Sequence, residues 1–273
     1  MVEMNIKKRI AVLIDAENVS PDYIEAIFDE ISALGGVPTY KRIYGNFLSN
    51  QLKGWNVIAN QYALYQVQQQ NFTRGKNSSD SVLIIDTMDI LHSGTVDGIC
   101  IVSSDSDFTR LAMRIVESGL DVIGMGEEKT AVSFVNACSE FRYLEYLGSG
   151  DKEDEGDDED EDDSREGGGS PGKKSSGNAA AREAKTVNAP KNVIATIKAA
   201  ITENADDDGW THIGPVGSAL KSRYPDFDPR RYGSGSKQLS AFFKLLGEFE
   251  VIARGTDSKK AYYIKIREDM KGK

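Results

Sequence analysis

Residues 1–148 alternate between short apolar runs and stretches with helical spacing. The apolar runs are Arg9 to Ile14, Pro38 to Tyr44, Gly98 to Ser103 and Asp121 to Met125. Between the runs, apolar residues recur every three or four positions, as on one face of a helix, in Asp22 to Leu34, Ser79 to His92 and Phe108 to Ser118. Strands that are apolar on both faces and alternate with helices predict a doubly wound α/β domain with a mainly parallel sheet.

Residues 190–273 show a different pattern, in which three helical stretches precede two strands. The helices are indicated by Val193, Ile194, Ile197 and Ile201, by Pro215, Val216 and Leu220, and by Leu239, Phe242, Leu245 and Leu246 before Gly247. The strands are Glu248 to Arg254 and Ala261 to Ile266. Three helices followed by a β-ribbon predict a small winged helix-turn-helix domain.

The segment 149–189 lies between these two parts and has almost no large apolar residue. We expect it to be a disordered acidic and Gly/Ser-rich linker, because it cannot bury enough apolar surface to offset its ordering entropy. The chain has a net charge of -10, and the stretch 151–166, with 12 acidic and 2 basic residues, accounts for all of it. We favour a solvated linker over the alternative, in which the segment acts as an acidic decoy for a basic surface.

Composition excludes several other classes of protein. Two cysteines and two histidines support neither a disulfide scaffold nor a Cys/His zinc cluster. The longest apolar runs are far shorter than the roughly 20 residues of a membrane helix, and no signal peptide is readable. We expect a soluble, cytoplasmic protein without membrane contact.

Carboxylates follow the predicted strands at the points where the strands end. Asp15 follows the first strand, Asp105 and Asp107 follow the strand from Gly98, and Asp80 begins a helix. Ligands of open α/β sheets bind outside the carboxyl ends of the strands. Each Asp taken alone is better explained as a helix cap, but the three sites together favour a metal cluster. Oxygen ligands suit Mg²⁺ or Mn²⁺, and the chemistry that fits is phosphodiester hydrolysis.

Three segments resemble the motifs of the NYN domain, a PIN-like nuclease family. They are Ile14-Asp15-Ala16-Glu17-Asn18, Lys76-Asn77-Ser78-Ser79-Asp80 and Val102-Ser103-Ser104-Asp105-Ser106-Asp107-Phe108, and Lys129 to Tyr143 resembles the family's closing helix. The resemblance covers about residues 8 to 146. It implies an Mg²⁺- or Mn²⁺-dependent ribonuclease site with catalytic, metal-binding acids at Asp15, Asp80, Asp105 and Asp107 and with Asn18 as a polar neighbour. Ser78 and Ser104 depart from the pattern, which often has Gly there.

The C-terminal part resembles the LOTUS family, also called OST-HTH. The similarity lies in Asp208-Gly209-Trp210, in the segment from Tyr224 to Gly233, and in Leu239 and Phe249-Glu250-Val251. It covers about residues 190 to 268 and implies binding of single-stranded or structured RNA, with protein partners in other members.

Basic residues in both domains are candidates for phosphate contacts. They are Lys41, Arg42, Arg74 and Lys76 in the first domain and Arg230, Arg231, Lys237, Lys244, Lys259 and Lys260 in the second. Ordinary surface charge is the alternative for each, and we prefer it for Lys41 and Arg42. Tyr62, Tyr65 and Phe72 could stack on bases, but the helical spacing of the two tyrosines favours the core, where we also expect Trp210.

The sequence therefore predicts a metal-dependent ribonuclease tethered to an RNA-binding domain, without a need for a fixed domain arrangement. Two alternatives stay open: a non-catalytic RNA-binding adaptor, and a flap-type DNA nuclease with the same carboxylate-rich architecture. A weaker alternative is a phosphohydrolase that uses Asp15 as its nucleophile.

Overall fold

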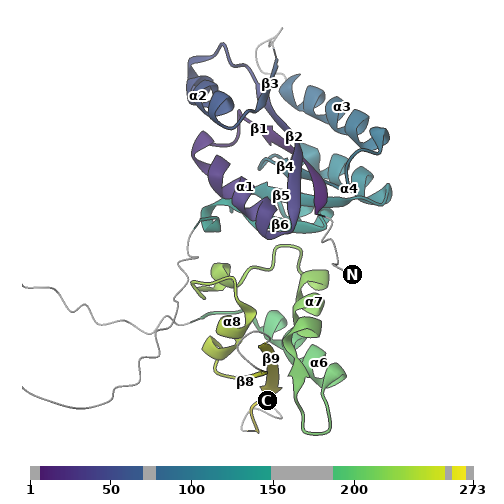
Figure 1. Ribbon diagram of the computed structural model, residues 1–273, viewed down its shortest axis with the longest axis vertical. Coiled ribbons are helices and arrows are strands. Elements are labelled where there is room, and N and C mark those ends of the chain that lie inside the picture. Colours follow the sequence, from purple (N-terminus) through teal and green to yellow (C-terminus); the bar gives the residue numbers. More distant parts are fainter. Residues whose placement is uncertain (1–6, 70–77, 149–186, 256–259, 269–273) are drawn as a thin grey trace, which may run out of the picture.

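The computed structural model describes residues 7–69, 78–148, 187–255 and 260–268, which form two domains (Figure 1). The linker predicted over 149–189 lies outside the described residues except for its last three positions. None of the described helices combines the length and the apolar composition that a membrane span requires.

A parallel sheet forms the centre of the N-terminal domain, with the strand order β3-β2-β1-β4-β5-β6 in the described part of the chain. Its strands are β1 (Lys8–Asp15), β2 (Gly36–Gly45), β3 (Tyr65–Gln68), β4 (Gly98–Val102), β5 (Asp121–Gly126) and β6 (Glu140–Tyr143). Strand β1 pairs with β2 on one side and with β4 on the other, so the order of the strands reverses there. The predicted doubly wound fold is confirmed, and β1 and β4 are neighbours as the clustering of carboxylates requires.

Helices cover both faces of this sheet (Figure 1). They are α1 (Ile24–Ala33), α2 (Lys53–Gln61), α3 (Ser78–Ser93), α4 (Thr109–Glu117) and α5 (Val132–Ala137), with short 3₁₀ turns η1 (Pro21–Tyr23), η2 (Asn50–Leu52), η3 (Ser106–Phe108) and η4 (Leu144–Tyr146). The sequence missed α2 and β3, because α2 buries only Trp55 and Ala59 and therefore shows little apolar periodicity.

The expected closing helix from Lys129 to Tyr143 is interrupted. Cys138 has extended backbone angles, and the next amide, of Ser139, donates to the carbonyl oxygen of Val122 at 2.9 Å. This bond starts the pairing of β6 with β5, so a short helix and an edge strand replace one long helix.

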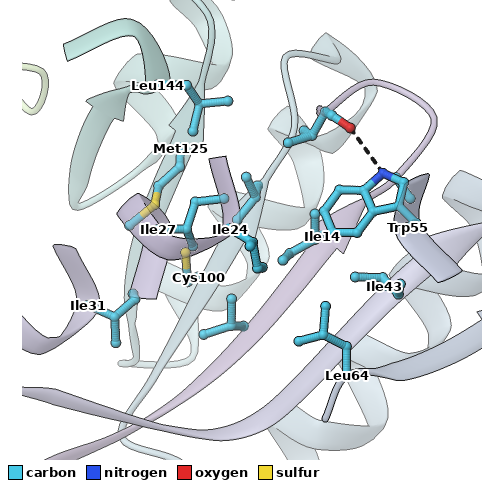
Figure 2. Packing of buried hydrophobic residues seen from close by; sticks show 14 of the residues in the cluster. Ile14, Ile24, Ile27, Ile31, Ile43, Trp55, Leu64, Cys100, Met125 and Leu144 are labelled. Atoms are coloured by element: carbon cyan, nitrogen blue, oxygen red, sulfur yellow. Dashed lines mark hydrogen bonds between the residues drawn. The ribbon is translucent and has the colours of Figure 1, made fainter. Parts of the chain in front are cut away.

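Alternate residues of β1 enter two hydrophobic cores on opposite faces of the sheet. Ile10, Val12 and Ile14 pack against α1 and α2, whereas Ala11 and Leu13 pack against α3, α4 and α5. Figure 2 shows the first core, in which the indole Nε1 of buried Trp55 donates to the carbonyl oxygen of Val19 at 3.2 Å. Burial on both faces explains why β1 is continuously apolar.

The C-terminal domain is the predicted winged helix. Its elements are α6 (Lys191–Asn204), β7 (Thr211–His212), α7 (Ile213–Arg223), the 3₁₀ turn η5 (Pro229–Tyr232), α8 (Leu239–Leu245), β8 (Phe249–Arg254) and β9 (Ala261–Ile266). The two predicted strands pair antiparallel, and the two-residue strand β7, too short to show a pattern, joins β9 on its other side.

The two domains touch along the free edge of β6. The amide of Phe141 donates to the carbonyl oxygen of Pro225 at 2.8 Å, and the Tyr143 hydroxyl donates to Asp226 at 3.2 Å. The guanidinium of Arg231 lies 4.6 Å from the centre of the Tyr143 ring. A direct contact therefore exists in addition to the tether expected from the sequence.

Candidate metal centre

Three of the predicted metal ligands come together at the carboxyl edge of the sheet. Asp80 lies in the first turn of α3, while Asp105 caps η3 directly after β4 and Asp107 lies within that turn. Each of the three side chains offers a carboxylate oxygen within 4.8 Å of the others. The strand order reverses between β1 and β4, which is where ligands of doubly wound sheets bind.

Asp15, the last residue of β1, is 2% exposed and lies beside this group. Its Oδ2 accepts hydrogen bonds from the Asn18 amide at 2.7 Å and from the Ser103 hydroxyl at 2.9 Å, and its Oδ1 accepts from the backbone of Glu17 at 3.2 Å. Burial raises the pKa of Asp15 above its ordinary value, and these hydrogen bonds partly offset the rise. The sequence identified Asn18 as a polar neighbour but missed Ser103, although its place at the end of β4 was a signal.

Electrostatic repulsion marks the centre of the cluster. Burial, together with the charges of Asp15, Asp105 and Asp107, raises the pKa of Asp80 to about 6. A divalent cation among these oxygens would relieve both effects. The donor set contains oxygen alone and therefore fits Mg²⁺ or Mn²⁺, with Asp80, Asp105 and Asp107 as ligands.

The two basic residues of β2 that were predicted to contact phosphates have partners within their own domain. The ammonium of Lys41 donates to the carbonyl oxygen of Tyr62 at 2.7 Å, and Arg42 forms an ion pair with Asp86 at 2.7 Å. Arg74 and Lys76, and the aromatic candidate Phe72, lie outside the described residues. Tyr62 stacks on Phe28, whereas Tyr65 is 66% exposed on β3 rather than in the core.

Two of the predicted basic residues of the C-terminal domain, Arg230 and Lys237, lie close to Glu30 of the N-terminal domain. The carboxylate of Glu30 from α1 binds Lys237 at 2.9 Å and lies 3.8 Å from Arg230, while its other oxygen accepts from Arg142 of β6 at 3.1 Å. Arg230 also binds Asp228 at 2.5 Å. We call Glu30, Arg142, Asp228, Arg230 and Lys237 the interdomain joint.

The remaining basic candidates lie outside this joint. Arg231 pairs with Asp226 next to the joint, Lys244 is exposed on α8, and Lys260 is exposed just before β9. Lys259 lies outside the described residues. Phosphate contact by all of these residues stays a prediction.

A cavity of about 860 Å³ opens beside the loop that follows Asp15. Its mainly polar walls come from the ends of β1 and β2 and from η2 and α2, and include Glu17, Asn18, Ser20, Asn46 and Gln51. Among the described residues that line it, none is Lys or Arg. The space is large enough for a nucleotide, and the chemistry of its walls suits a base or a ribose better than a phosphate.

Comparison with protein families matches residues 9–145 to the NYN domain and residues 188–261 to the OST-HTH/LOTUS domain. The chain belongs to the NYN family, which is part of a nuclease superfamily, and it carries a second, OST-HTH/LOTUS domain. A search of curated proteins found no match.

Solved structures with similarity to this chain include two proteins without a described function. One, from Vibrio parahaemolyticus, is 19% identical with a TM-score of 0.43, and the match covers 52% of this chain and 94% of that protein. The other, from Nitrosomonas europaea, is 32% identical with a TM-score of 0.26, and the match covers 36% of this chain and 92% of that protein.

Proposed function

We propose that this protein is a ribonuclease that hydrolyses RNA phosphodiester bonds with Mg²⁺ or Mn²⁺ held by Asp80, Asp105 and Asp107. The observation that carries the proposal is the convergence of three carboxylates, with buried Asp15 beside them, at the reversal point of the sheet. Holding like charges together costs folding free energy, and such clusters are typical of functional sites.

The metal, when bound, lowers the pKa of a coordinated water and offsets charge on the reacting phosphate. The residues of the chain have separate tasks. Asp15 is held in one orientation by Asn18 and Ser103 and adds negative charge that favours the cation. The cavity beside it accepts an uncharged part of the substrate, which leaves the phosphate at the carboxylates.

RNA is favoured over DNA by the second domain. NYN and OST-HTH/LOTUS domains together suggest an RNA-directed nuclease. An RNA-binding domain on the same chain raises the local concentration of substrate at the carboxylates.

Cleavage of labelled single-stranded RNA with Mn²⁺, Mg²⁺ or chelator tests the proposal. The critical variant is Asp105→Asn, and its control is Asp89→Asn, which removes an exposed carboxylate from α3. Metal-dependent cleavage that persists in Asp89→Asn and disappears in Asp105→Asn supports the assignment. Equal residual activity in both variants indicates a contaminant and leaves an RNA-binding adaptor as the function. Faster cleavage of matching DNA favours the flap-type nuclease.

A further inference from the structure

The winged-helix domain has a second face, on the outer side of its sheet. The inner side, with Phe249, Val251 and Ile264, packs on the hydrophobic core of the domain. The outer side is formed by the alternate residues of β8 and β9 that point away from this core, and by β7 and the residue before it. We call this surface the wing face, and its residues are Trp210, His212, Arg254, Tyr263 and Lys265.

Aromatic rings and cations alternate on the wing face. The guanidinium carbon of Arg254 lies 4.7 Å from the centre of the Tyr263 ring and 5.7 Å from that of Trp210. The ammonium of Lys265 lies 5.8 Å from the Trp210 ring, and His212 meets Tyr263 edge-on at 5.5 Å. Base stacking and phosphate contacts need rings and cations within reach of each other.

Trp210 is held on this face by a hydrogen-bonded turn. The backbone amide of Trp210 donates to the carboxylate of Asp206 at 2.7 Å, and the amide of Asp206 donates to the carbonyl oxygen of Trp210 at 2.8 Å. Gly209 has a φ of +81°, and a Cβ at this position would lie 3.4 Å from the side chain of Lys265. The sequence suggested that Trp210 lies in the core, but the side chain is half-buried on this face. Because the turn holds Trp210 in place, little ordering is needed on binding.

The strands that carry the wing face lie away from the N-terminal domain. In Figure 1, β8 and β9 lie at the end of the C-terminal domain that is remote from β6. The joint engages Arg230 and Lys237 with carboxylates, whereas the cations of the wing face lie over aromatic rings. The two basic regions of this domain therefore have different partners.

We propose that the wing face binds single-stranded RNA, with unpaired bases stacked on Trp210 and Tyr263 and with phosphates at Arg254 and Lys265. The inference rests on the proposed RNA-directed function and adds the surface that captures the strand. A duplex would present phosphates to the cations but would leave the rings without bases. Alternating rings and cations therefore fit an unpaired strand.

Binding of a short labelled oligouridine to the full chain in chelator tests this assignment by fluorescence anisotropy. Trp210→Ala and Tyr263→Ala are each expected to weaken binding about tenfold. Arg254→Ser is expected to lower the slope of log affinity against log salt by about 0.7, the contribution of one single-strand phosphate contact. The matched control is Tyr262→Ala, which removes a ring of 36% exposure from the other side of β9 and is expected to leave affinity unchanged.

Tryptophan emission gives a second measurement that does not depend on an alanine variant. The chain contains two tryptophans, and Trp55 is 1% exposed in the core of the N-terminal domain. Stacking of a base on Trp210 is expected to quench emission on RNA addition, and Trp210→Phe is expected to abolish the quenching.

Several results would overturn the proposal. They are unchanged affinity in both Trp210→Ala and Tyr263→Ala, an equal loss in Tyr262→Ala, and RNA binding without quenching. Binding of polyglutamate in place of RNA would also overturn it and would assign the face to an acidic protein. Failure of the nuclease proposal is distinct, because it is measured by metal-dependent cleavage, whereas these experiments contain no metal.

Discussion

The carboxyl edge of the sheet and the interdomain joint both bury carboxylates, but they treat the negative charge in opposite ways. At the edge, Asp80 is surrounded by Asp15, Asp105 and Asp107, and burial with these charges raises its pKa to about 6. In the joint, burial by itself would raise the pKa of Asp228, yet the hydrogen bonds and charge of Arg230 lower it below its ordinary value.

The carboxylates of the joint are paired with cations of the fold, whereas the carboxylates of the edge are crowded together in an arrangement that suits a bound cation. Glu30, 5% exposed, has cations from both domains within ion-pair distance, so its charge serves the structure. The charges around Asp80 oppose its ionisation and reduce the stability of the metal-free fold. Crowded, destabilising charges of this kind are typical of functional sites, and this supports the cation proposed for the cluster.

Removing the central carboxylate of the joint should have the largest effect on stability. Glu30→Ala leaves Arg142 and Arg230 buried without this partner, and we expect a loss of about 3–5 kcal/mol in the free energy of unfolding. Urea unfolding of the full chain measures the loss. The control is Asp29→Ala on the same helix, where the side chain is exposed and the change should be small. Equal effects in the two variants would contradict the role of Glu30 in the joint.

At the carboxyl edge, activity should respond more than stability. Asp80→Asn is expected to reduce metal-dependent RNA cleavage on the order of a hundredfold, the scale of losing one group that stabilises charge in a transition state. Initial rates at saturating Mn²⁺ measure the effect, beside Asp89→Asn. Full activity in Asp80→Asn would remove this residue from the site.

Metal addition should stabilise the edge and leave the joint unaffected. At a Mn²⁺ concentration about 100 times the dissociation constant, the gain is about 2.7 kcal/mol, because the ion binds the folded state. Thermal unfolding with and without Mn²⁺ should show a higher midpoint for the wild type and for Asp29→Ala but no shift for Asp105→Asn. An unchanged shift in Asp105→Asn would place the ion elsewhere.

The smallest expected effect is a pH dependence in chelator. The pKa of Asp80 is about 6 in the folded chain, above the ordinary value of 3.8. The folded state therefore binds more protons than the unfolded chain between these values, and stability from this group rises as the pH falls from about 6 to about 4. Compared with Asp80→Asn, the wild type should gain roughly 2 kcal/mol over this range, measured by urea unfolding. A loss of relative stability would contradict the raised pKa.

Much of the fold and of the carboxyl edge could be predicted because both depend on local periodicity. Continuous apolar runs identified β1, β4 and β5, and the residues just after a strand lie at its carboxyl end whatever the rest of the chain does. The approach of Asp15 to Asp105 followed from the pairing of β1 with β4. The break at Cys138 and the strand β3 did not follow, since each depends on hydrogen bonds to a neighbouring strand.

Charge pairing could not be predicted in the same way. Glu30 lies on the apolar face of α1 with Ile27 and Ile31. A carboxylate at this position is buried only if cations from distant parts of the chain pack against it. One of these cations, Arg142, is 112 residues away in sequence, and the others belong to the second domain. The sequence therefore predicted phosphate contacts for Arg230 and Lys237 and did not identify them as partners of Glu30.

By itself, the sequence determined the two domain types, the parallel sheet and the carboxylates at its edge, because these follow from residue spacing over a few turns or strands. Tertiary structure alone decided which charges neutralise one another and which stay crowded together. It also decided that Trp210, Arg254 and Tyr263 share one face. Electrostatic and stacking contacts act between side chains that meet in space, and such meetings are set by strand register and domain contact rather than by local periodicity.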